Sequence, residues 1–373
     1  MPDPVVYAIG RTPRRAVDPA RPPIRSVSVC VPAKNEAARL PDFFDALAPA
    51  IVRAQLSGLA CEVAIALDGC TDASFEIVAA RALSFPCPVR AFGLPAHPVP
   101  HAGRARRAAM EAGLEGVAAL RSHALLTTDA DTRVDGDWIA ASAHALAHTD
   151  LVAGWVDWDG ESEIADLVAQ EDYFSELHRL RRRIDPVAFD AADPHHKMYG
   201  ASLSIRASAY RAVGGLPELA SSEDVALTRA IRLAGLRMRQ DRDVRVLTST
   251  RRSGRATGGF SDAILSDTAR AARGEPQQVE DPDALVGIYR TGARLRAAFE
   301  AGDRDLLKAG GRAGGAGTDI PDFEFEQAWA GAPSADAFVT RLTEPLHVDG
   351  RVSLAHARAR VRDMHDQLGR SGR

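Results

Sequence analysis

The chain has 373 residues, of which 46% are hydrophobic and 26% charged, and its formal net charge is −4. This length and composition are typical of a globular protein with one large domain and a smaller one. The slightly acidic balance argues against nucleic acid as a partner, and no apolar run reaches the roughly 18–20 residues that a membrane-spanning helix needs.

Residues 1–24 open the chain with a Pro- and Arg-rich segment. It has no continuous apolar run, so we expect an extended leader and not a secretory signal. The apolar, β-branched residues 26–31 then predict a strand, and Asn35 is placed to cap the helix that follows. This strand contains Cys30, one of four cysteines without CxxC spacing. That pattern is typical of buried thiols in a reduced, cytoplasmic protein.

Two further strand–helix units repeat this plan. A strand over residues 62–67 ends at Asp68 and leads into a helix. A strand over residues 89–94 precedes a helix over residues 103–120. Because apolar strands alternate with helices, the sequence predicts an α/β fold with a Rossmann-like, mostly parallel sheet and helices on both faces.

A fourth strand, residues 124–131, ends in Asp129 and Asp131. Ligands bind at the carboxyl ends of the strands in parallel sheets. Residues 32–36, Asp68 and this Asp pair are therefore expected along one edge of the sheet, although they lie far apart in the sequence.

After residue 135 the pattern changes. The sequence predicts a strand over residues 150–160 and a helix over residues 161–184, followed by a strand and a short helix within residues 197–216. A further helix is predicted within residues 221–238, ending at Gly235. A strand then begins at residue 244 and leads into a Gly- and Arg-rich loop that extends to residue 259. Residues 260–373 are rich in Ala and Arg and predict a mainly helical C-terminal region.

Asp129 and Asp131 flank a single residue, so both carboxylates can point into one cleft. Mg²⁺ or Mn²⁺ prefers oxygen ligands and takes only one or two from protein when phosphates and water supply the rest. The pair therefore fits a divalent metal that carries a charged substrate. An ordinary turn with a capping Asp is the alternative from these residues alone.

Glu223 and Asp224 lie in the first turn of a predicted helix. The helix dipole favours acidic residues there, so the pair can be purely structural. The functional alternative is a general base that takes a proton from an incoming hydroxyl.

Two basic segments can bind an anion. Arg106 lies near the start of a helix, where backbone N–H groups and a basic side chain favour a phosphate. Arg251, Arg252 and Arg255 lie among glycines that let guanidinium groups approach a diphosphate. Both segments can also be solvated basic surfaces.

Six segments follow one another in the order seen in family 2 glycosyltransferases of the GT-A fold. They are VSVCVPAKNEAARL, ALDGCTD, GRARRAAMEAGL, TTDADTRV, YGASLSIRASAYRAVGGL and SEDVALTRAIRLAG. The resemblance covers residues 26–259 and implies a GT-A domain over residues 25–259, with a nucleotide-binding half (25–134) and an acceptor half (135–259). Residues 260–373 would then be a C-terminal helical extension. The QxxRW motif of processive members is missing, which implies a non-processive enzyme.

The resemblance also implies roles for individual residues. The nucleotide-sugar donor, a UDP- or GDP-sugar, would be bound by Pro32, Ala33, Asn35, Glu36, Asp68, Arg106 and Asp129, with Glu36 near the ribose and Asp68 at the base. Asp131 would bind Mg²⁺ or Mn²⁺ with support from Asp129. Asp224 would be the general base of an inverting transfer, with Glu223 as second choice. Tyr199, Gly200 and Ala201 would lie on the acceptor side.

Three other functions compete with this interpretation. A nucleotidyltransferase would carry a glycine-rich loop with Lys or Arg after its first strand, and PAKNEAARLP has no such glycine. A catalytically inactive GT-A binding module would have no need of Asp68, Asp129, Asp131 and Asp224 together. A dehydrogenase would show GxGxxG after its first strand. The acceptor stays unknown, and contact of the chain with a membrane surface stays open.

Overall fold

The computed structural model describes residues 21–95, 97, 101–160, 165–251, 260–304, 320–346, 348 and 350–371. The chain divides into two compact units. Of the described residues, unit 1 comprises those within Ala169–Ala188 and Arg273–Arg373, and unit 2 comprises those from residue 21 to Val168 and within Phe189–Ala272. The domain boundaries predicted at residues 24 and 259 stay predictions.

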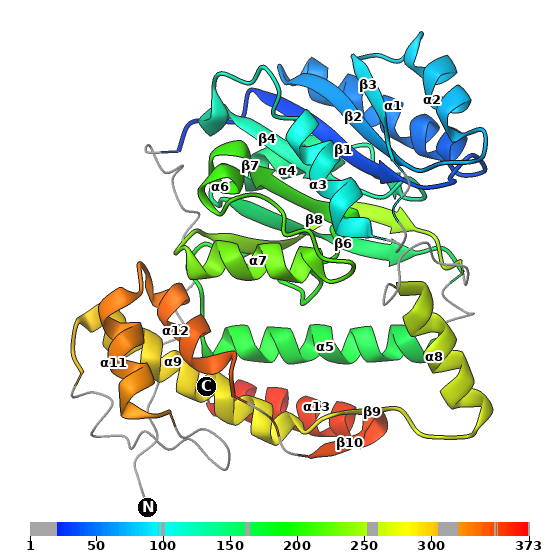
Figure 1. Cartoon of the computed structure of the whole chain (residues 1–373). Helices are drawn as coiled ribbons and strands as arrows, with labels where there is room; N and C mark the ends of the chain where they lie inside the picture. The colour runs from blue at the N-terminus through cyan, green and yellow to red at the C-terminus, as the bar shows by residue number, and fades with distance from the viewer. Residues whose placement is uncertain are drawn as a thin grey trace, which may run out of the picture. The chain divides into compact units, whose positions relative to one another are not determined.

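Unit 2 is built on an eight-stranded sheet in the order β3-β2-β1-β4-β7-β6-β8-β5 (Figure 1). The strands are β1 (Ser26–Ala33), β2 (Ala60–Asp68), β3 (Val89–Leu94), β4 (His123–Thr127), β5 (Arg133–Val134), β6 (Leu151–Trp158), β7 (Leu203–Arg206) and β8 (Met238–Thr248). The pairs among β1, β2, β3 and β4 are parallel, as is β6 with β8. β7 runs antiparallel to β4 and β6, and β5 antiparallel to β8.

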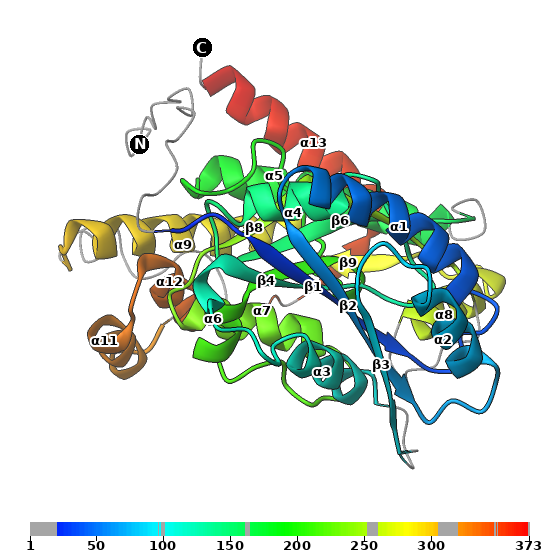
Figure 2. The same ribbon diagram turned by 90° about the horizontal axis from the view of Figure 1, so that it is seen from above.

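Helices cover both faces of this sheet, as Figure 2 shows for α1 and α4 on one face and α3, α6 and α7 on the other. The helices of unit 2 are α1 (Leu40–Leu56), α2 (Ser74–Ala82), α3 (Ala102–Ala112), α4 (Trp138–Ala145), α6 (Ala207–Ala212), α7 (Glu223–Leu233) and α8 (Phe260–Ala272), together with the first residues of α5 (Ala165–Ile184). The predicted fold class is confirmed in its architecture: an α/β fold with a mostly parallel sheet, helices on both faces and a mainly helical C-terminal region.

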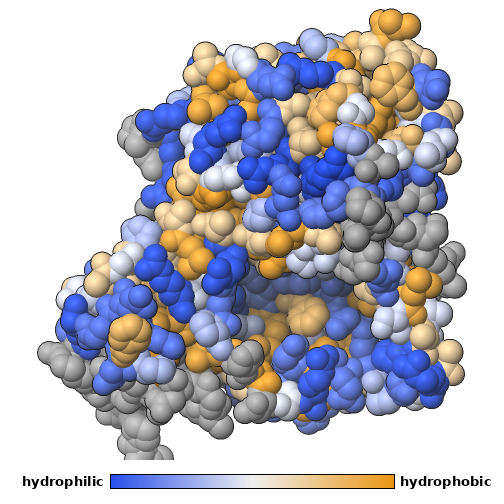
Figure 3. Space-filling view, viewed as in Figure 1, coloured by the Kyte–Doolittle hydropathy of each residue, from blue (hydrophilic) through white to orange (hydrophobic). Residues whose placement is uncertain are grey.

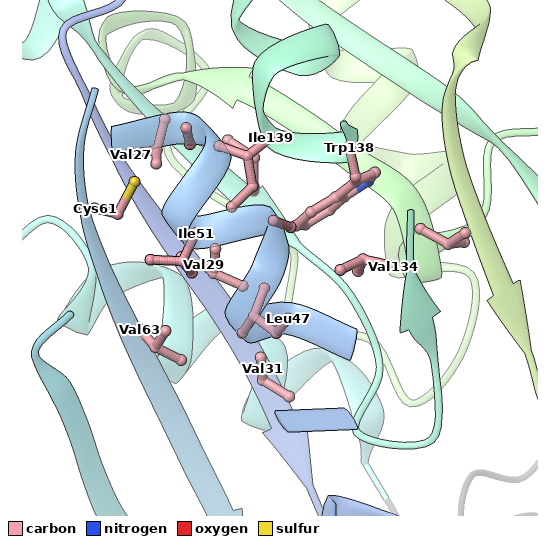
Figure 4. Close-up of a cluster of buried hydrophobic side chains, with 14 of the residues drawn as sticks. Val27, Val29, Val31, Leu47, Ile51, Cys61, Val63, Val134, Trp138 and Ile139 are labelled. Carbon is pink, nitrogen blue, oxygen red and sulfur yellow. The ribbon is translucent and has the colours of Figure 1, made fainter. Parts of the chain in front are cut away.

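The core of unit 2 follows from the alternation along β1. Val27, Val29 and Val31 point to one face, where Leu47 of α1 and Trp138 of α4 pack against them (Figure 4). Cys30 points to the opposite face and joins a second core cluster. Because a parallel strand is buried on both faces, six of the eight residues of β1 are apolar, and the other two are Ser26 and Ser28.

Three local predictions were wrong at element ends. The helix predicted over residues 103–120 ends at Ala112, and Gly116 has a φ of 76° that interrupts the helical pattern. β4 ends at Thr127, so the Asp pair lies in the loop after it and not in the strand. α1 begins at Leu40, and Asn35 does not cap it because its side chain accepts a hydrogen bond from the Thr71 backbone instead.

The pairing of strand β6 with its neighbours β7 and β8 is irregular. β7 pairs with it only over Leu151–Ala153, and its register with β8 shifts between Gly154 and Trp155. A Cβ at Gly154 would collide with the Ser202 hydroxyl and the Val244 carbonyl, so only glycine fits this point. Beyond the end of β7, Lys197 Nζ donates to the carbonyl oxygen of Val156 at 2.6 Å.

Unit 1 has two hydrophobic clusters of its own. Its elements are the greater part of α5, β9 (Gln278–Glu280), α9 (Pro282–Ala301), α11 (Asp322–Gly331), α12 (Ala335–Thr343), β10 (Arg351–Ser353) and α13 (Leu354–Ser371). One cluster joins α5, α9 and α13, and the other joins α9, α11 and α12. Arg296 of α9 pairs with Asp185 at 2.6 Å and with Asp336 at 2.7 Å, which ties the helices together. The sequence predicted these helices but not the antiparallel pair β9–β10.

Among the described residues, none of the helices combines the length and the apolar composition needed to cross a bilayer. Hydrophilic and hydrophobic side chains are interspersed over the face of unit 2 seen in Figure 3. The cytoplasmic location expected from the cysteines stays a prediction.

Candidate functional site

The carboxyl ends of three parallel strands bring the predicted site residues to one edge of the sheet. Ala33 at the end of β1 lies in register with Leu67 of β2, and Cys30 with Thr127 of β4. The loops that follow β1 and β4 carry Glu36 and Asp129. The predicted convergence at one edge therefore follows from the observed strand order.

Arg106 of α3 is the most extensively bonded side chain at this edge. Its Nε donates to Glu223 Oε1 at 3.0 Å, and its Nη2 donates to Asp129 Oδ1 at 2.8 Å. Its Nη1 donates to the Thr127 hydroxyl at 2.8 Å and to the carbonyl oxygen of Gly200 at 2.9 Å. Burial would lower the pKa of Arg106, but the two carboxylates hold it above its usual value. One guanidinium thus joins four segments of unit 2.

Asp224 lies beside this group and has a different environment from Glu223. Its Oδ2 accepts from the Gly200 backbone N–H at 2.8 Å, and its Oδ1 accepts from the Val225 N–H at 2.7 Å. Burial, and then the neighbouring Glu223 carboxylate, raise the pKa of Asp224 above its usual value. Glu223 is only 5% exposed and forms an ion pair with Arg106, whereas Asp224 is partly exposed.

A second group forms where Arg251, in the segment just after β8, meets two acidic residues. Its guanidinium binds both carboxylate oxygens of Glu36, at 2.5 and 2.6 Å, and lies 3.2 Å from Asp131 Oδ2. Burial and the neighbouring Asp129 raise the pKa of Asp131 to about 7. The carboxylates of Glu36, Asp129 and Asp131 therefore lie close together. Arg251 forms ion pairs with two of them, Glu36 and Asp131.

A third group surrounds Asp68 at the end of β2. This buried carboxylate accepts from Arg104 Nη1 at 3.0 Å and lies 3.7 Å from Lys34 Nζ. Its cationic partners differ from Arg251, which pairs with Asp131, so Asp68 lies at the same edge but in a separate group. Sequence reasoning missed Arg104 and Lys34 as its partners.

Two residues beside these groups have an unusual backbone. Among the described residues, Asn35 (φ 53°) and Ser222 (φ 61°) are the only non-glycine residues with positive φ. Asn35 directly precedes Glu36, and Ser222 directly precedes the Glu223–Asp224 pair. Such strain costs of order 1–3 kcal/mol and is concentrated at functional sites. No sequence signal distinguishes these positions in advance.

The remaining predicted residues lie as follows. Pro32 and Ala33 end β1, and Ala201 is buried in the main core cluster. Tyr199 packs against the cluster that contains Trp158 and Ile264. Arg252 and Arg255 lie outside the described residues.

The loop before Gly200 is anchored by a buried lysine, which the sequence did not reveal. Lys197 is 1% exposed, and its Nζ lies 4.0 Å from the ring centre of Trp155 and 3.6 Å from that of Trp158. Its backbone N–H donates to His195 Nδ1 at 3.1 Å. Burial and the charge of Arg242 lower the pKa of His195 to about 3, so this imidazole is neutral.

The carboxylates fit a metal site that substrate phosphates complete, and not a site made of protein ligands alone. No group of three or more His, Cys, Asp or Glu within the described ranges is arranged to hold an ion by protein ligands alone. Burial, and then the neighbouring Asp129, raise the pKa of Asp131, so a cation bound beside it would favour its ionised form. One or two carboxylates that share a cation with substrate phosphates are the usual protein ligands of Mg²⁺, and Asp131 with Asp129 fits that pattern.

No protein-family model and no curated protein matches the sequence. Among solved structures, S. aureus TarS 1–349 in complex with UDP-GlcNAc is 16% identical, over 93% of this chain and 91% of that one, with a TM-score of 0.46. The mannosyltransferase PcManGT from Pyrobaculum calidifontis, in complex with GDP-Man and Mn²⁺, is 16% identical over 96% of this chain and 79% of that one, with a TM-score of 0.47. Similarities at this level establish neither the activity nor the ligands of this chain.

Proposed function

We propose that the protein is a metal-dependent, inverting glycosyltransferase of the family 2 type. It would transfer a sugar from a nucleotide-diphosphate donor to an acceptor hydroxyl. The observation that carries the proposal is the meeting of Asp129, Arg106 and the Glu223–Asp224 pair, which are distant in sequence, around one guanidinium.

The donor would lie along the carboxyl ends of β1, β2 and β4. Asp68 would accept a hydrogen bond from the nucleobase, and Glu36 would bind the ribose. Asp131, supported by Asp129, would hold Mg²⁺ or Mn²⁺, and the bound ion would neutralise the charge that develops on the leaving diphosphate. Both Glu36 and Asp131 contact Arg251, so its guanidinium must shift before these carboxylates can take their ligands.

Asp224 would act as the general base. Its raised pKa improves it as a proton acceptor near neutral pH. Two backbone N–H groups fix its orientation while each oxygen keeps a free lone pair. Glu223 is less suited to this role because it is more deeply buried and its carboxylate is bound by Arg106.

In the transfer step, the acceptor oxygen would form a bond to the anomeric carbon while the bond from that carbon to the diphosphate oxygen breaks. The acceptor proton would pass to an Asp224 oxygen, and the nucleoside diphosphate would leave with the bonding electron pair. A single displacement of this kind inverts the anomeric configuration, because the acceptor attacks from the face opposite the leaving group.

The test is a nucleotide-release assay with a panel of UDP- and GDP-sugars, with and without Mn²⁺. We expect slow hydrolysis of sugar donors that carry one of the two nucleobases, and Mn²⁺ should stimulate it. The matching nucleoside diphosphate should raise the melting temperature of the protein. Pyrophosphate released from a nucleoside triphosphate and a sugar phosphate would indicate a nucleotidyltransferase instead. Donor binding without any release of nucleotide would indicate an inactive binding module.

A further inference from the structure

Arg106 was expected to bind the nucleotide, but its contacts assign it another role. A guanidinium has five N–H donors. Four of them are used within the protein, and the side chain is 6% exposed. An arginine that binds a substrate phosphate bidentately needs two free donors facing the ligand. Arg106 has one left.

The four bonds join the two sides of the site. Asp129 and Thr127 belong to the donor side, at the end of β4. Glu223 and Gly200 belong to the acceptor side, and Gly200 in turn donates its N–H to Asp224. The position of the proposed base relative to the proposed metal-binding loop therefore depends on this one guanidinium.

We propose that Arg106 is a positioning residue, which sets the spacing between Asp129 and the Gly200–Asp224 pair, and is not a nucleotide ligand. This inference rests on the proposed function. The fixed planar fork of the guanidinium is needed for the role, because a lysine ammonium has three donors and cannot reach four acceptors in these directions.

Gly200 supports the same assignment. A Cβ at this position would lie 2.7 Å from both Cζ and Nη2 of Arg106. The guanidinium therefore lies flat against the Gly200 backbone, and any side chain there would displace it. This requirement comes from packing, since Gly200 is not among the glycines with positive φ.

The experiment compares Arg106→Lys and Arg106→Met with Arg107→Lys in the same helix. The Arg107 guanidinium donates to the backbone oxygens of Leu216 and Gly214 and pairs with Glu218 at 3.6 Å, and it contacts none of the three acidic residues Asp129, Glu223 and Asp224. Each variant is measured for melting temperature, affinity for UDP and GDP without metal, kcat, donor KM and the pH profile of kcat/KM.

We expect Arg106→Lys to lower kcat at least about 30-fold, because displacing a catalytic group by about 1 Å has effects of this size. The affinity for the nucleotide and the donor KM should change by less than about 3-fold. Arg107→Lys should behave like the wild type. Weaker binding of the matching nucleotide by 10-fold or more, with kcat unchanged, would show that Arg106 is a ligand and overturn the proposal.

The pH profile distinguishes positioning from simple loss of stability. The charged groups that act on Asp224 are Glu223 and Arg106. Arg106→Met removes the positive charge, so the acid limb should move to higher pH. Arg106→Lys keeps the charge and should leave the limb in place. Identical limbs in wild type and Arg106→Met would contradict the proposal.

If Arg106→Met does not fold, Gly200→Ala provides the second test because it changes no charge. It should reduce kcat as Arg106→Lys does, and the two substitutions together should cost no more than either alone. Additive losses would overturn the proposal. A wild-type protein that turns over no nucleotide-sugar would instead overturn the proposed function, and this assignment with it.

Discussion

Arg106 and Arg251 both bind a pair of acidic residues, yet their surroundings differ. Arg106 is buried, and two of its four bonds go to the neutral acceptors Thr127 and Gly200. The side chain of Arg251 is 21% exposed, and its guanidinium is bound by the carboxylates of Glu36 and Asp131. The first arginine is part of the architecture of the site. The second occupies a place where another cation can compete with it.

The largest expected effect tests the group around Arg106. Asp224→Asn removes the proposed base but keeps its size and one hydrogen-bond acceptor. Transfer should fall by more than about 100-fold, in line with general-base contributions, while donor binding is kept. The exposed Asp243, on β8, supplies Asp243→Asn as a control. Near-normal turnover of Asp224→Asn would remove this residue from the role.

The next prediction tests the group around Arg251. Asp131→Ala should abolish the effect of Mn²⁺ on donor affinity, because the ion loses its main protein ligand. Titration calorimetry with the matching donor, with and without Mn²⁺, measures this directly. A donor affinity that still rises with Mn²⁺ in the variant would count against Asp131 as the ligand.

His195, a buried group outside both arginine clusters, shows the effect of burial together with the neighbouring charge of Arg242. His195 is fully buried and its pKa is lowered to about 3 from 6.5, so the folded state holds it neutral while the unfolded state takes up a proton below pH 6.5. Its contribution to stability is therefore present above pH 6.5 and is lost as the pH falls towards 3.

Between pH 7 and pH 5 the wild type should lose about 2 kcal/mol more unfolding free energy than His195→Phe, as the pKa difference implies. Urea unfolding at the two pH values measures the difference, with His196→Asn as the neighbouring control. Equal losses in the wild type and His195→Phe would show that His195 is not held neutral by the fold.

The smallest effect sharpens the comparison of the two arginines. Arg251→Met removes the cation that competes for Asp131, so Mn²⁺ alone should bind about 3- to 10-fold more tightly, as expected for loss of a partly screened charge. Arg245→Met, on β8 but paired with Asp157, is the matched control. Weaker Mn²⁺ binding by Arg251→Met would mean that this guanidinium supports the ion and does not compete with it.

The sequence predicted those features that depend on local patterning. The apolar residues of β1, β2 and β4 predicted these strands but not where each one ends, and parallel pairing places Asp68 and Asp129 at one edge. The sequence did not predict that β5 and β7 run antiparallel to their neighbours, because strands of 2 and 4 residues carry too little periodicity. The direction of a strand depends on its neighbours, which single-sequence patterns do not contain.

The contacts within the candidate site were harder to predict from the sequence than the strands. An arginine near the start of a helix favours an anion site in the sequence, but Arg106 instead faces two carboxylates of its own chain. Lys197 gave no signal because a buried lysine held by two indole rings depends on how β6 and the loop before Gly200 meet. The strained φ of Asn35 and Ser222 likewise depends on the tertiary structure.

The position of Lys197 beside β6 has a consequence for which residues this place in the sheet can tolerate. The pairing of β7 with β6 stops at Ala153, and the buried carbonyl of Val156 accepts from the Lys197 ammonium instead. A buried carbonyl that loses such a donor costs about 1–3 kcal/mol. The same side chain that fixes the loop before Gly200 therefore also satisfies a strand carbonyl that β7 does not reach.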